Sequence, residues 1–254
     1  MAEVKFTLKI WRGTPRHQYF EEFEIVLIHG MNIVSVLMEI QKNPVSKEGK
    51  RTTPVVWEMA CLEEVCGSCS MLINGLPRQS CSTLIEPLLH ETGKDVITLA
   101  PFSKFPLVRD LYVNRDRMFE SLKRVSAWNP IDTTFSPEFG PTVSPKEQDS
   151  MYTESTCMTC GCCLEACPQF SSSRHFIGAA AISQVKLFNS QPIGSLLKGE
   201  RLTALMDKGG ISECGNAQNC VAVCPKHIPL TESIADIGGE ASRHAFKLLF
   251  GLPN

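Results

Sequence analysis

The residues of this chain that could carry chemistry are its cysteines, of which there are 12. Five of them lie between Cys157 and Cys167, and Pro168 follows directly. Four of these five have the spacing C-x2-C-x2-C-x3-C-P, in which three closely spaced thiolates hold one iron–sulfur cubane and the fourth ligates a second cluster. A second cluster is therefore expected, with further ligands elsewhere in the chain.

A second cysteine run, from Cys214 to Pro225, repeats this spacing with one change. Ala217 stands where the run has its second cysteine, and an alanine side chain cannot hold iron. When the last cysteine of each run ligates the other cluster, one cluster receives four thiolates and the other three. The predicted ligands of a [4Fe-4S] cluster are Cys157, Cys160, Cys163 and Cys224. Those of a [3Fe-4S] cluster are Cys167, Cys214 and Cys220.

A third group of cysteines has the spacing C-x4-C-x2-C followed by a distant fourth cysteine, which is typical of a plant-type [2Fe-2S] cluster. Its predicted ligands are Cys61, Cys66, Cys69 and Cys81. Gly67 and Ser68 can turn backbone N–H groups toward the cluster sulfurs without a bulky side chain between them. One cysteine, Cys162, is left over, and we interpret it as a packed thiol, with a redox or alternative-ligand role as the other reading.

Other kinds of site would use cysteines differently. A pair of zinc sites would combine C-x2-C motifs into closed tetrahedra, and neither the C-P endings nor a set of three thiolates suits that arrangement. A disulfide framework is typical of secreted chains, and this N-terminus does not have the pattern of a signal peptide. A fourth iron that carries water, hydroxide or an unusual ligand is the alternative to a three-iron cluster beside Ala217.

The composition limits the class of partner. The 254 residues carry a formal net charge of −2 with a pI of about 6.3, so no basic face for nucleic acid is expected. The best candidate for a membrane span, residues 25–40, is interrupted by His29, Gly30, Asn32 and Glu39, so no span is predicted there. The N-terminus lacks a signal core and the character of a transit peptide, which favours the cytoplasm of a prokaryote.

The N-terminal part has the pattern of a small mixed sheet packed on a helix. Apolar residues alternate over 4–10 and again over 23–27, which predicts the two strands of a hairpin. Asn32 can cap a helix whose apolar residues share one face. Further strands are predicted at 71–73 and 96–99, the first leading into a turn at Asn74-Gly75.

The remainder of the chain has a mainly helical pattern. A helix is predicted from Pro106 through Leu122. The arginines around it, Arg115 and Arg117 among them, are expected on a solvated face, with a partner-docking surface as the other reading. Residues 129–150 contain several prolines and predict an extended connector. Further helices are predicted at 179–188, 200–206 and 230–250, the last either continuous or interrupted at Gly238-Gly239.

These patterns predict an α+β fold of two domains. Residues 1–104 would form a β-grasp, plant-type ferredoxin domain, and residues 105–254 an all-α domain that resembles bacterial ferredoxins. The sequence has no phosphate-binding glycine loop, no Ser/His/Asp nucleophile arrangement and no flavin fingerprint. We therefore expect the chain to carry electrons and hold no substrate, while another subunit performs the two-electron chemistry.

The cysteine motifs and Phe176-Ile177-Gly178 together resemble the iron–sulfur subunit of succinate dehydrogenase and fumarate reductase over nearly the whole chain. The missing cysteine at Ala217 is part of that family's pattern. The resemblance implies a partner flavoprotein with covalent FAD that oxidises succinate. It also implies that electrons pass through the [2Fe-2S], [4Fe-4S] and [3Fe-4S] clusters to quinone at a membrane anchor, and that the chain is peripheral on the cytoplasmic face of the bacterial cell membrane.

The sequence departs from ubiquinone-reducing relatives near the predicted [3Fe-4S] cluster. Ser171 and Ser172 stand where those relatives have a tryptophan, and Gly215 stands where they have a histidine. Residues 215–219 and 181–185 resemble the branch whose anchor is a single dihaem cytochrome b, usually coupled to menaquinone. We therefore expect haem b in a partner subunit and menaquinone as the quinone.

Rival functions share the cluster motifs. The same chain could serve a quinol:fumarate reductase or a different flavoprotein, such as a hydroxy-acid oxidase. A free-standing ferredoxin-type carrier would lack the apolar docking surface that we expect around Phe170, Phe176 and residues 246–252. A zinc-stapled interaction module would be colourless.

Overall fold

The computed structural model describes residues 3–130 and 142–252. The chain forms two compact units. Unit 1 consists of Met1–Arg115 and Met158–Ala166, and unit 2 of Asp116–Cys157 and Cys167–Asn254. The domain boundary at 104/105 stays a prediction, because units defined by packing need not coincide with domains.

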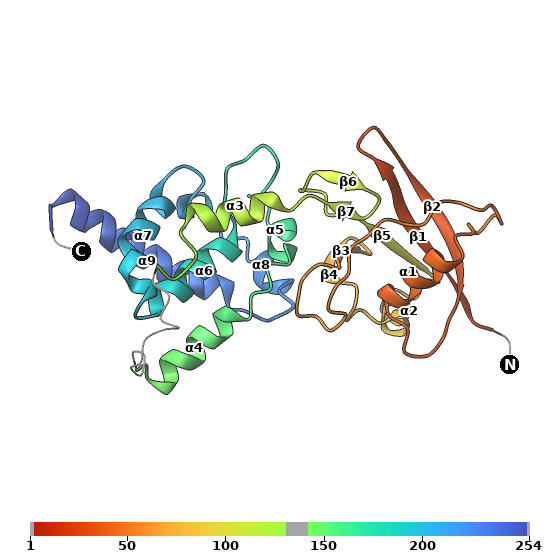
Figure 1. Ribbon diagram of the computed structural model, residues 1–254, viewed down its shortest axis with the longest axis horizontal. Helices are drawn as coiled ribbons and strands as arrows, with labels where there is room; N and C mark the ends of the chain where they lie inside the picture. Colours follow the sequence, from red (N-terminus) through yellow and green to blue (C-terminus); the bar gives the residue numbers. More distant parts are fainter. Residues whose placement is uncertain (1–2, 131–141, 253–254) are drawn as a thin grey trace. The chain divides into compact units, whose positions relative to one another are not determined.

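Unit 1 is built on a five-stranded sheet with the strand order β2-β1-β5-β3-β4 (Figure 1). The strands are β1 (Lys5–Thr14), β2 (His17–Val26), β3 (Ser70–Ile73), β4 (Leu76–Gln79) and β5 (Val96–Ala100). The predicted hairpin is the antiparallel pair β1–β2, whereas β1 pairs with β5 in parallel. The turn at Asn74-Gly75 joins β3 to β4 as predicted, and both residues have positive φ.

Two helices cover the apolar side of this sheet. Helix α1 (Ile33–Lys42) begins with a capping box in which Asn32 accepts from the Ser35 N–H and Ser35 accepts from the Asn32 N–H, as the sequence signal favoured. Helix α2 is Ile85–Thr92. The buried faces of both helices share one core with alternate residues of β1, β3 and β5. Because β3 and β4 belong to this sheet, the core holds in place the two segments next to them. One of these segments leads into β3, and the other follows β4.

The helix predicted from Pro106 is wrong over its first half. The chain there forms a hairpin of β6 (Leu107–Arg109) and β7 (Tyr112–Val113), and α3 covers only Asp116–Arg124. The cause lies at Asp110, which has a φ of 51° at the turn of this hairpin. Its carboxylate accepts from the N–H of Gly13 at 2.7 Å and from that of Val56 at 2.9 Å, so contacts distant in sequence override the local helical pattern.

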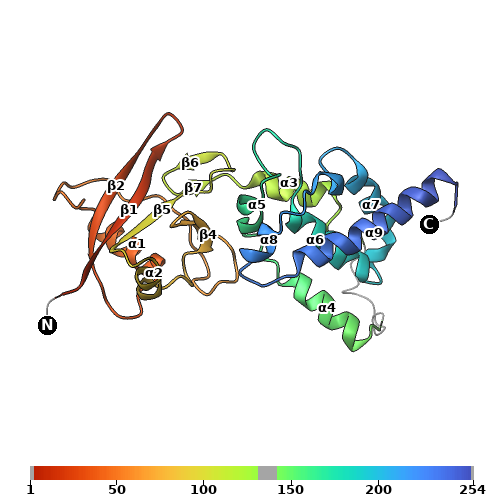
Figure 2. The ribbon, with the colours of Figure 1, turned by 180° about the vertical axis from the view of Figure 1, so that it is seen from behind.

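Unit 2 is helical among its described residues. Its longer helices are α3, α4 (Pro145–Ser155), α6 (Ala179–Ser190), α7 (Lys198–Met206) and α9 (Leu230–Leu249), and its shorter ones are α8 (Asn219–Ala222) and the 3-10 turns η1 (Gly194–Leu197) and η2 (Ile211–Glu213). Helix α6 packs against α3, α4, α7 and α9, and the views in Figures 1 and 2 both show α9 running along it. Helix α5 (Cys162–Ala166) belongs to unit 1.

In unit 2, the structure corrects one prediction from the sequence and decides between the two alternatives of another. The predicted connector over 129–150 ends in α4, because Ser144 and Glu147 form a capping box and Pro145 occupies the first helical position. The part of that connector at 131–141 lies outside the described residues. Helix α9 runs through Gly238-Gly239 without a break. No helix in the described part of the chain is both long and apolar enough to cross a bilayer.

Candidate metal centres

The predicted [2Fe-2S] ligands lie in the loop that enters β3 and directly after β4. Backbone N–H groups in this loop point at sulfur: those of Val65 and Cys66 lie 3.3 Å from Cys61 Sγ, and that of Ser68 lies 3.5 Å from Cys66 Sγ. Such donors favour the thiolate form of a cysteine over the thiol. The loop is therefore arranged to hold negative sulfur.

The loop reaches this arrangement through unusual backbone angles. Leu62, Glu64 and Gly67 have φ values of 63°, 57° and 73°. Only glycine adopts such angles freely, so the two other residues carry backbone strain that the surrounding contacts must hold. Strain of this kind is typical of sites at which the backbone itself must face a ligand.

The four thiols differ in how readily they lose a proton. Burial raises the pKa of Cys66, but hydrogen bonds from Ser68 and the contact with Cys61 outweigh it and bring that pKa to about 6. Burial raises the pKa of Cys69 to about 12, with Cys81 beside it. Because metal ligation requires thiolates, binding of a metal must remove the proton from Cys69.

A buried hydroxyl gives an independent test of whether a cluster fits here. Ser80 lies between Gln79 and Cys81 in sequence, is 0% exposed, and its Oγ has no hydrogen-bond partner among the described residues. A buried donor without an acceptor is costly unless a further group supplies one. A sulfur-rich cluster beside Cys81 would supply that acceptor, so the residues present fit the group that the spacing predicts.

Arg115 is a functional residue that the sequence analysis placed wrongly on a solvated face. Its side chain is 13% exposed and donates to the carbonyls of Gly67 at 2.7 Å, Ser68 at 2.8 Å and Ser70 at 3.3 Å. Three carbonyls of the ligand loop are thus held by one guanidinium. No spacing rule in the sequence could have found this contact, because Arg115 lies 45 to 48 residues from its partners.

The segment 158–166 packs against this loop within unit 1. A Cβ on Gly67 would lie 2.8 Å from the Cα of Cys160 and 2.8 Å from the carbonyl oxygen of Met158, so only glycine permits this approach. The carboxylate of Glu165 accepts from the N–H and hydroxyl of Ser103 at 2.9 and 2.6 Å, which anchors α5. The backbones of two predicted ligand loops are therefore in contact.

Cys162, which was left over in the ligand assignment, is fully buried. Its hydrogen bond to Cys160 raises the pKa of Cys162 and lowers that of Cys160 to about 7, so Cys162 is the thiol that keeps its proton. This agrees with its interpretation as a packed thiol.

The predicted [3Fe-4S] ligands come together in unit 2. A cavity is lined by Cys167, Cys214 and Cys220, and Ala217 forms part of the same wall. Burial raises the pKa of Cys220, and the nearby Cys167 and Cys214 raise it further. The site thus offers three sulfurs and one methyl group, which fits a cluster that lacks one iron corner.

The four predicted [4Fe-4S] ligands are divided between the two units. Cys157 and Cys224 lie in unit 2 and are partly exposed, whereas Cys160 and Cys163 are buried in unit 1. Across the part of the chain that the structure describes, no three His, Cys, Asp or Glu side chains group as they would around a single metal ion. All the individual ligand assignments stay predictions.

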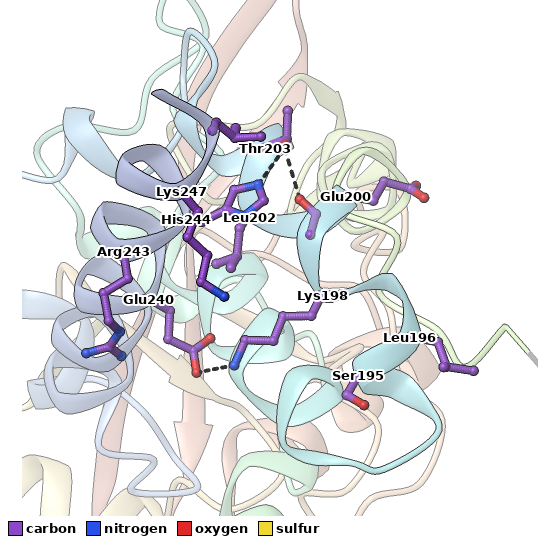
Figure 3. Close-up of a pocket in the computed structure, with 12 residues that line it drawn as sticks. Ser195, Leu196, Lys198, Glu200, Leu202, Thr203, Glu240, Arg243, His244 and Lys247 are labelled. Carbon is purple, nitrogen blue, oxygen red and sulfur yellow. Dashed lines mark hydrogen bonds and ion pairs between the residues drawn. The ribbon is translucent and has the colours of Figure 1, made fainter. Parts of the chain in front are cut away.

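A hollow without cysteines lies between α7 and α9 in unit 2 (Figure 3). Lys198 and Glu240 pair across it at 2.7 Å, and Thr203 Oγ1 lies 3.0 Å from His244 Nε2. The docking surface predicted elsewhere in this unit is only partly present. Phe170 and Phe176 are 1% exposed, so they belong to the core, but the end of α9 exposes large apolar residues such as Phe246 and Leu249.

Comparison with known proteins shows which family the chain belongs to. A family model described as a 2Fe-2S iron-sulfur cluster binding domain matches residues 7–120, and one described as a 4Fe-4S dicluster domain matches residues 154–228. The succinate dehydrogenase iron-sulfur subunit of Bacillus subtilis is 54% identical over 233 residues, which cover 92% of this chain and 90% of that one. The chain belongs to the family of succinate dehydrogenase and fumarate reductase iron–sulfur subunits.

Other members of this family match at lower identity. The fumarate reductase iron-sulfur subunit of Wolinella succinogenes is 28% identical over 235 residues, covering 90% of this chain and 94% of its own. A chain of the Mycobacterium smegmatis Sdh1 complex in the apo form superposes with a TM-score of 0.80 at 20% identity, covering 96% of this chain and 98% of that one. The predicted fold, an N-terminal ferredoxin-type sheet domain with a [2Fe-2S] site and a helical dicluster domain, is confirmed, and so is the function as an electron-transfer subunit of an oxidoreductase complex.

Proposed function

We propose that this chain is the electron-transfer subunit of a succinate:quinone oxidoreductase and works with an FAD-containing flavoprotein and a membrane cytochrome b anchor. The 54% identity to a succinate dehydrogenase iron-sulfur subunit over nearly the full length of both chains carries this proposal. A pocket for succinate is not required in this chain, because the flavoprotein would hold the substrate.

The chain's own residues would hold the redox groups and set their environment. The clusters, when bound, supply one-electron redox chemistry that links a two-electron donor to quinone. In unit 1, backbone N–H groups stabilise the sulfurs of Cys61 and Cys66, and Arg115 fixes the carbonyls of the same loop. In unit 2, the three cysteines around Ala217 leave one corner without a thiolate, which supports a [3Fe-4S] cluster as the third centre.

The identity of the acceptor is a finer part of the proposal. Ser171, Ser172 and Gly215 replace the aromatic and histidine residues that ubiquinone-reducing relatives have near quinone. Gly215 lines the cavity of the three cysteines, and a Cβ there would lie 2.5 Å from Gln169 Nε2. A side chain at this position would therefore require the Gln169 side chain to move. We propose that a haem b of the anchor receives the electrons, that menaquinone is the final acceptor, and that the complex lies on the cytoplasmic face of the cell membrane.

The second candidate is a quinol:fumarate reductase, in which the same subunit would carry electrons in the opposite direction. The match to the subunit from Wolinella succinogenes favours it to a lesser degree, since its identity is 28% against 54% for the succinate dehydrogenase relative.

The test is purification of the complex from native membranes through an affinity tag on this chain. We expect a flavoprotein and a haem-containing anchor to co-purify, succinate to reduce the clusters, and menaquinone analogues to reoxidise them faster than ubiquinone analogues. A complex without flavin, or clusters that succinate leaves oxidised, would contradict the proposed partner. Faster reoxidation by ubiquinone analogues would contradict the proposed acceptor alone.

A further inference from the structure

A buried glutamine connects the two ligand segments of unit 1. Gln79, the last residue of β4, is 2% exposed. Its Oε1 accepts from Cys69 Sγ at 3.6 Å, and its Nε2 donates to Ser70 Oγ at 2.7 Å and to Cys162 Sγ at 3.5 Å. Cys69 is a predicted [2Fe-2S] ligand, and Cys162 lies between two predicted [4Fe-4S] ligands.

The contact with Cys69 depends on a proton that metal binding removes. In the arrangement described above, the Cys69 thiol donates to the amide oxygen of Gln79. A metal ligand must be a thiolate, which has no proton to donate. An amide oxygen facing a thiolate would be two acceptors in contact at a buried position, which costs free energy.

Rotation of the Gln79 side-chain amide by half a turn exchanges the positions of Oε1 and Nε2. This rotation removes the contact between the two acceptors. Nε2 then donates to the Cys69 thiolate. Oε1 then faces the Ser70 hydroxyl, which can donate to it, while the Cys162 thiol keeps its hydrogen bond to Cys160. Before the turn, the Ser70 hydroxyl donates to the carbonyl of Gly67 at 2.7 Å. The hydroxyl can donate to Oε1 instead, because Arg115 also donates to that carbonyl, at 2.7 Å. Both polar atoms of the Gln79 amide and the Ser70 hydroxyl keep a partner in the turned arrangement.

We propose that Gln79 is a positioning residue for electron transfer, whose amide donates a hydrogen bond to Cys69 Sγ in the cluster-bound protein and thereby raises the reduction potential of the [2Fe-2S] centre. A donor to a ligand sulfur favours the reduced, more negative cluster. This inference rests on the proposed function, since it assumes a [2Fe-2S] cluster on Cys69.

The experiment compares Gln79→Met with the unaltered complex, both purified from membranes. Methionine has nearly the same length and fills the cavity but cannot donate. The matched control is Gln18→Met, which makes the same change at an exposed position on β2, at the opposite edge of the sheet from β4. The readout is the [2Fe-2S] signal in a redox titration followed by electron paramagnetic resonance.

At the midpoint potential of the unaltered centre, we expect the ratio of reduced to oxidised cluster in Gln79→Met to fall about tenfold, which is a shift of about −59 mV for a one-electron couple. Gln18→Met should leave the ratio unchanged. A Gln79→Met complex with its full [2Fe-2S] signal and an unchanged ratio would overturn the inference. It would leave the proposed function intact, whereas an unaltered complex without any [2Fe-2S] signal would contradict the proposed function itself.

A second measurement does not depend on the folding of a variant. In the unaltered complex with nitrogen-15 in its glutamine amides, pulsed electron paramagnetic resonance on the reduced cluster should detect coupling to one amide nitrogen. That coupling should persist in Gln18→Met. Its absence from the unaltered complex would overturn the inference even if Gln79→Met fails to assemble its clusters.

Discussion

Individual residues matter most where the two ligand loops of unit 1 touch. Gly67 combines a φ of 73° with a position where a side chain would collide with the backbone of Cys160 and Met158. The sequence analysis singled out Gly67 for its exposure of backbone N–H groups. It could not predict the contact with Cys160, because that contact joins residues far apart in the chain.

Replacement of Gly67 by alanine should therefore reduce the iron and sulfide content of the purified complex severalfold, because the Cβ forces the two ligand loops apart. Gly75→Ala is the matched control. Gly75 has a φ of 79° but no atom within 4 Å of its added Cβ, so it reports the backbone strain alone. That strain costs on the order of 1 kcal/mol, and the clusters should remain. Equal cluster content in Gly67→Ala and Gly75→Ala would contradict the close approach.

Cysteine spacing predicts the ligand residues of a cluster but not the side chains that support them. Spacing alone indicated which cysteines converge around Ala217, because ligands of one cluster follow simple rules of reach. The side chains that support the ligands, Arg115 and Gln79 among them, follow no such rule. They are placed by the fold, and a polar residue in a strand or an arginine near a helix has the same local pattern when it is exposed.

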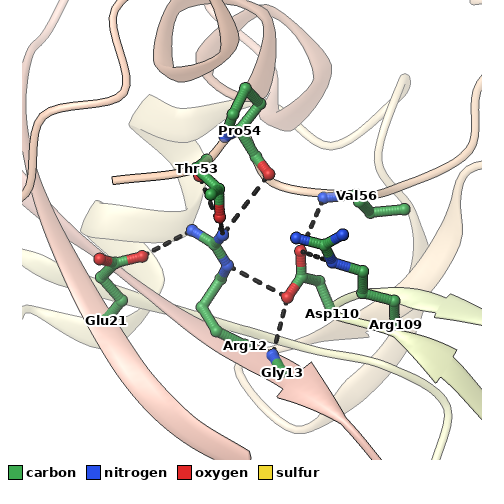
Figure 4. A network of polar contacts seen from close by, with 8 residues as sticks. All are labelled: Arg12, Gly13, Glu21, Thr53, Pro54, Val56, Arg109 and Asp110. Atoms are coloured by element: carbon green, nitrogen blue, oxygen red, sulfur yellow. Dashed lines mark hydrogen bonds and ion pairs between the residues drawn. The ribbon is translucent and has the colours of Figure 1, made fainter. Parts of the chain in front are cut away.

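At the scale of elements, a buried polar network ties the entry of the [2Fe-2S] loop to the sheet (Figure 4). Arg12 on β1 pairs with Glu21 at 2.5 Å and with Asp110 at 3.2 Å, and it donates to the carbonyl of Thr53 at 2.9 Å. Asp110 accepts from the N–H of Val56, a few residues before Cys61. The network therefore joins β1, β2, the β6–β7 turn and the segment that leads into the ligand loop.

Loss of Arg12 should leave the buried carboxylate of Asp110 with a weaker ion pair, to the half-exposed Arg109 at 3.9 Å. We expect Arg12→Met to lower the free energy of unfolding by about 3–5 kcal/mol, since the buried Asp110 would lose its closest ion-pair partner. The measurement is urea unfolding of the complex, followed by the visible absorbance of the clusters. Lys5 lies on β1 like Arg12, and Lys5→Met removes an exposed ion pair with Glu24 on β2, so it should change the free energy of unfolding little. Similar losses in both variants would show that burial of the network contributes nothing.

Elements with a strong local signal were predicted from the sequence, and those set by distant contacts were not. The Asn32 cap and the alternation in β1 and β2 gave α1 and the hairpin correctly. The hairpin of β6 and β7 was missed because Asp110 bonds to a residue 97 positions away. Helix α4 had a readable signal in Ser144, Pro145 and Glu147, but the surrounding prolines favoured a connector.

At the scale of the whole molecule, the account depends on three centres of different type in one chain. Two domains of known cluster type match the chain, and the cavity around Ala217 supports a third cluster with three thiolates. Clusters that differ in type, net charge and burial differ in reduction potential. Such a set suits single-electron transfer between a flavoprotein and a membrane acceptor, and the partners would supply the substrate and quinone sites.

Low-temperature electron paramagnetic resonance of the purified complex, unaltered and with Ala217→Cys, tests this account most directly. The unaltered complex should show a [3Fe-4S] signal when oxidised, and [2Fe-2S] and [4Fe-4S] signals after reduction by dithionite. Ala217→Cys adds the missing thiolate, so it should lose the oxidised signal and gain a second [4Fe-4S] signal on reduction. An unaltered complex that is silent when oxidised and shows two cubanes when reduced would contradict the role of Ala217 and the three-iron centre.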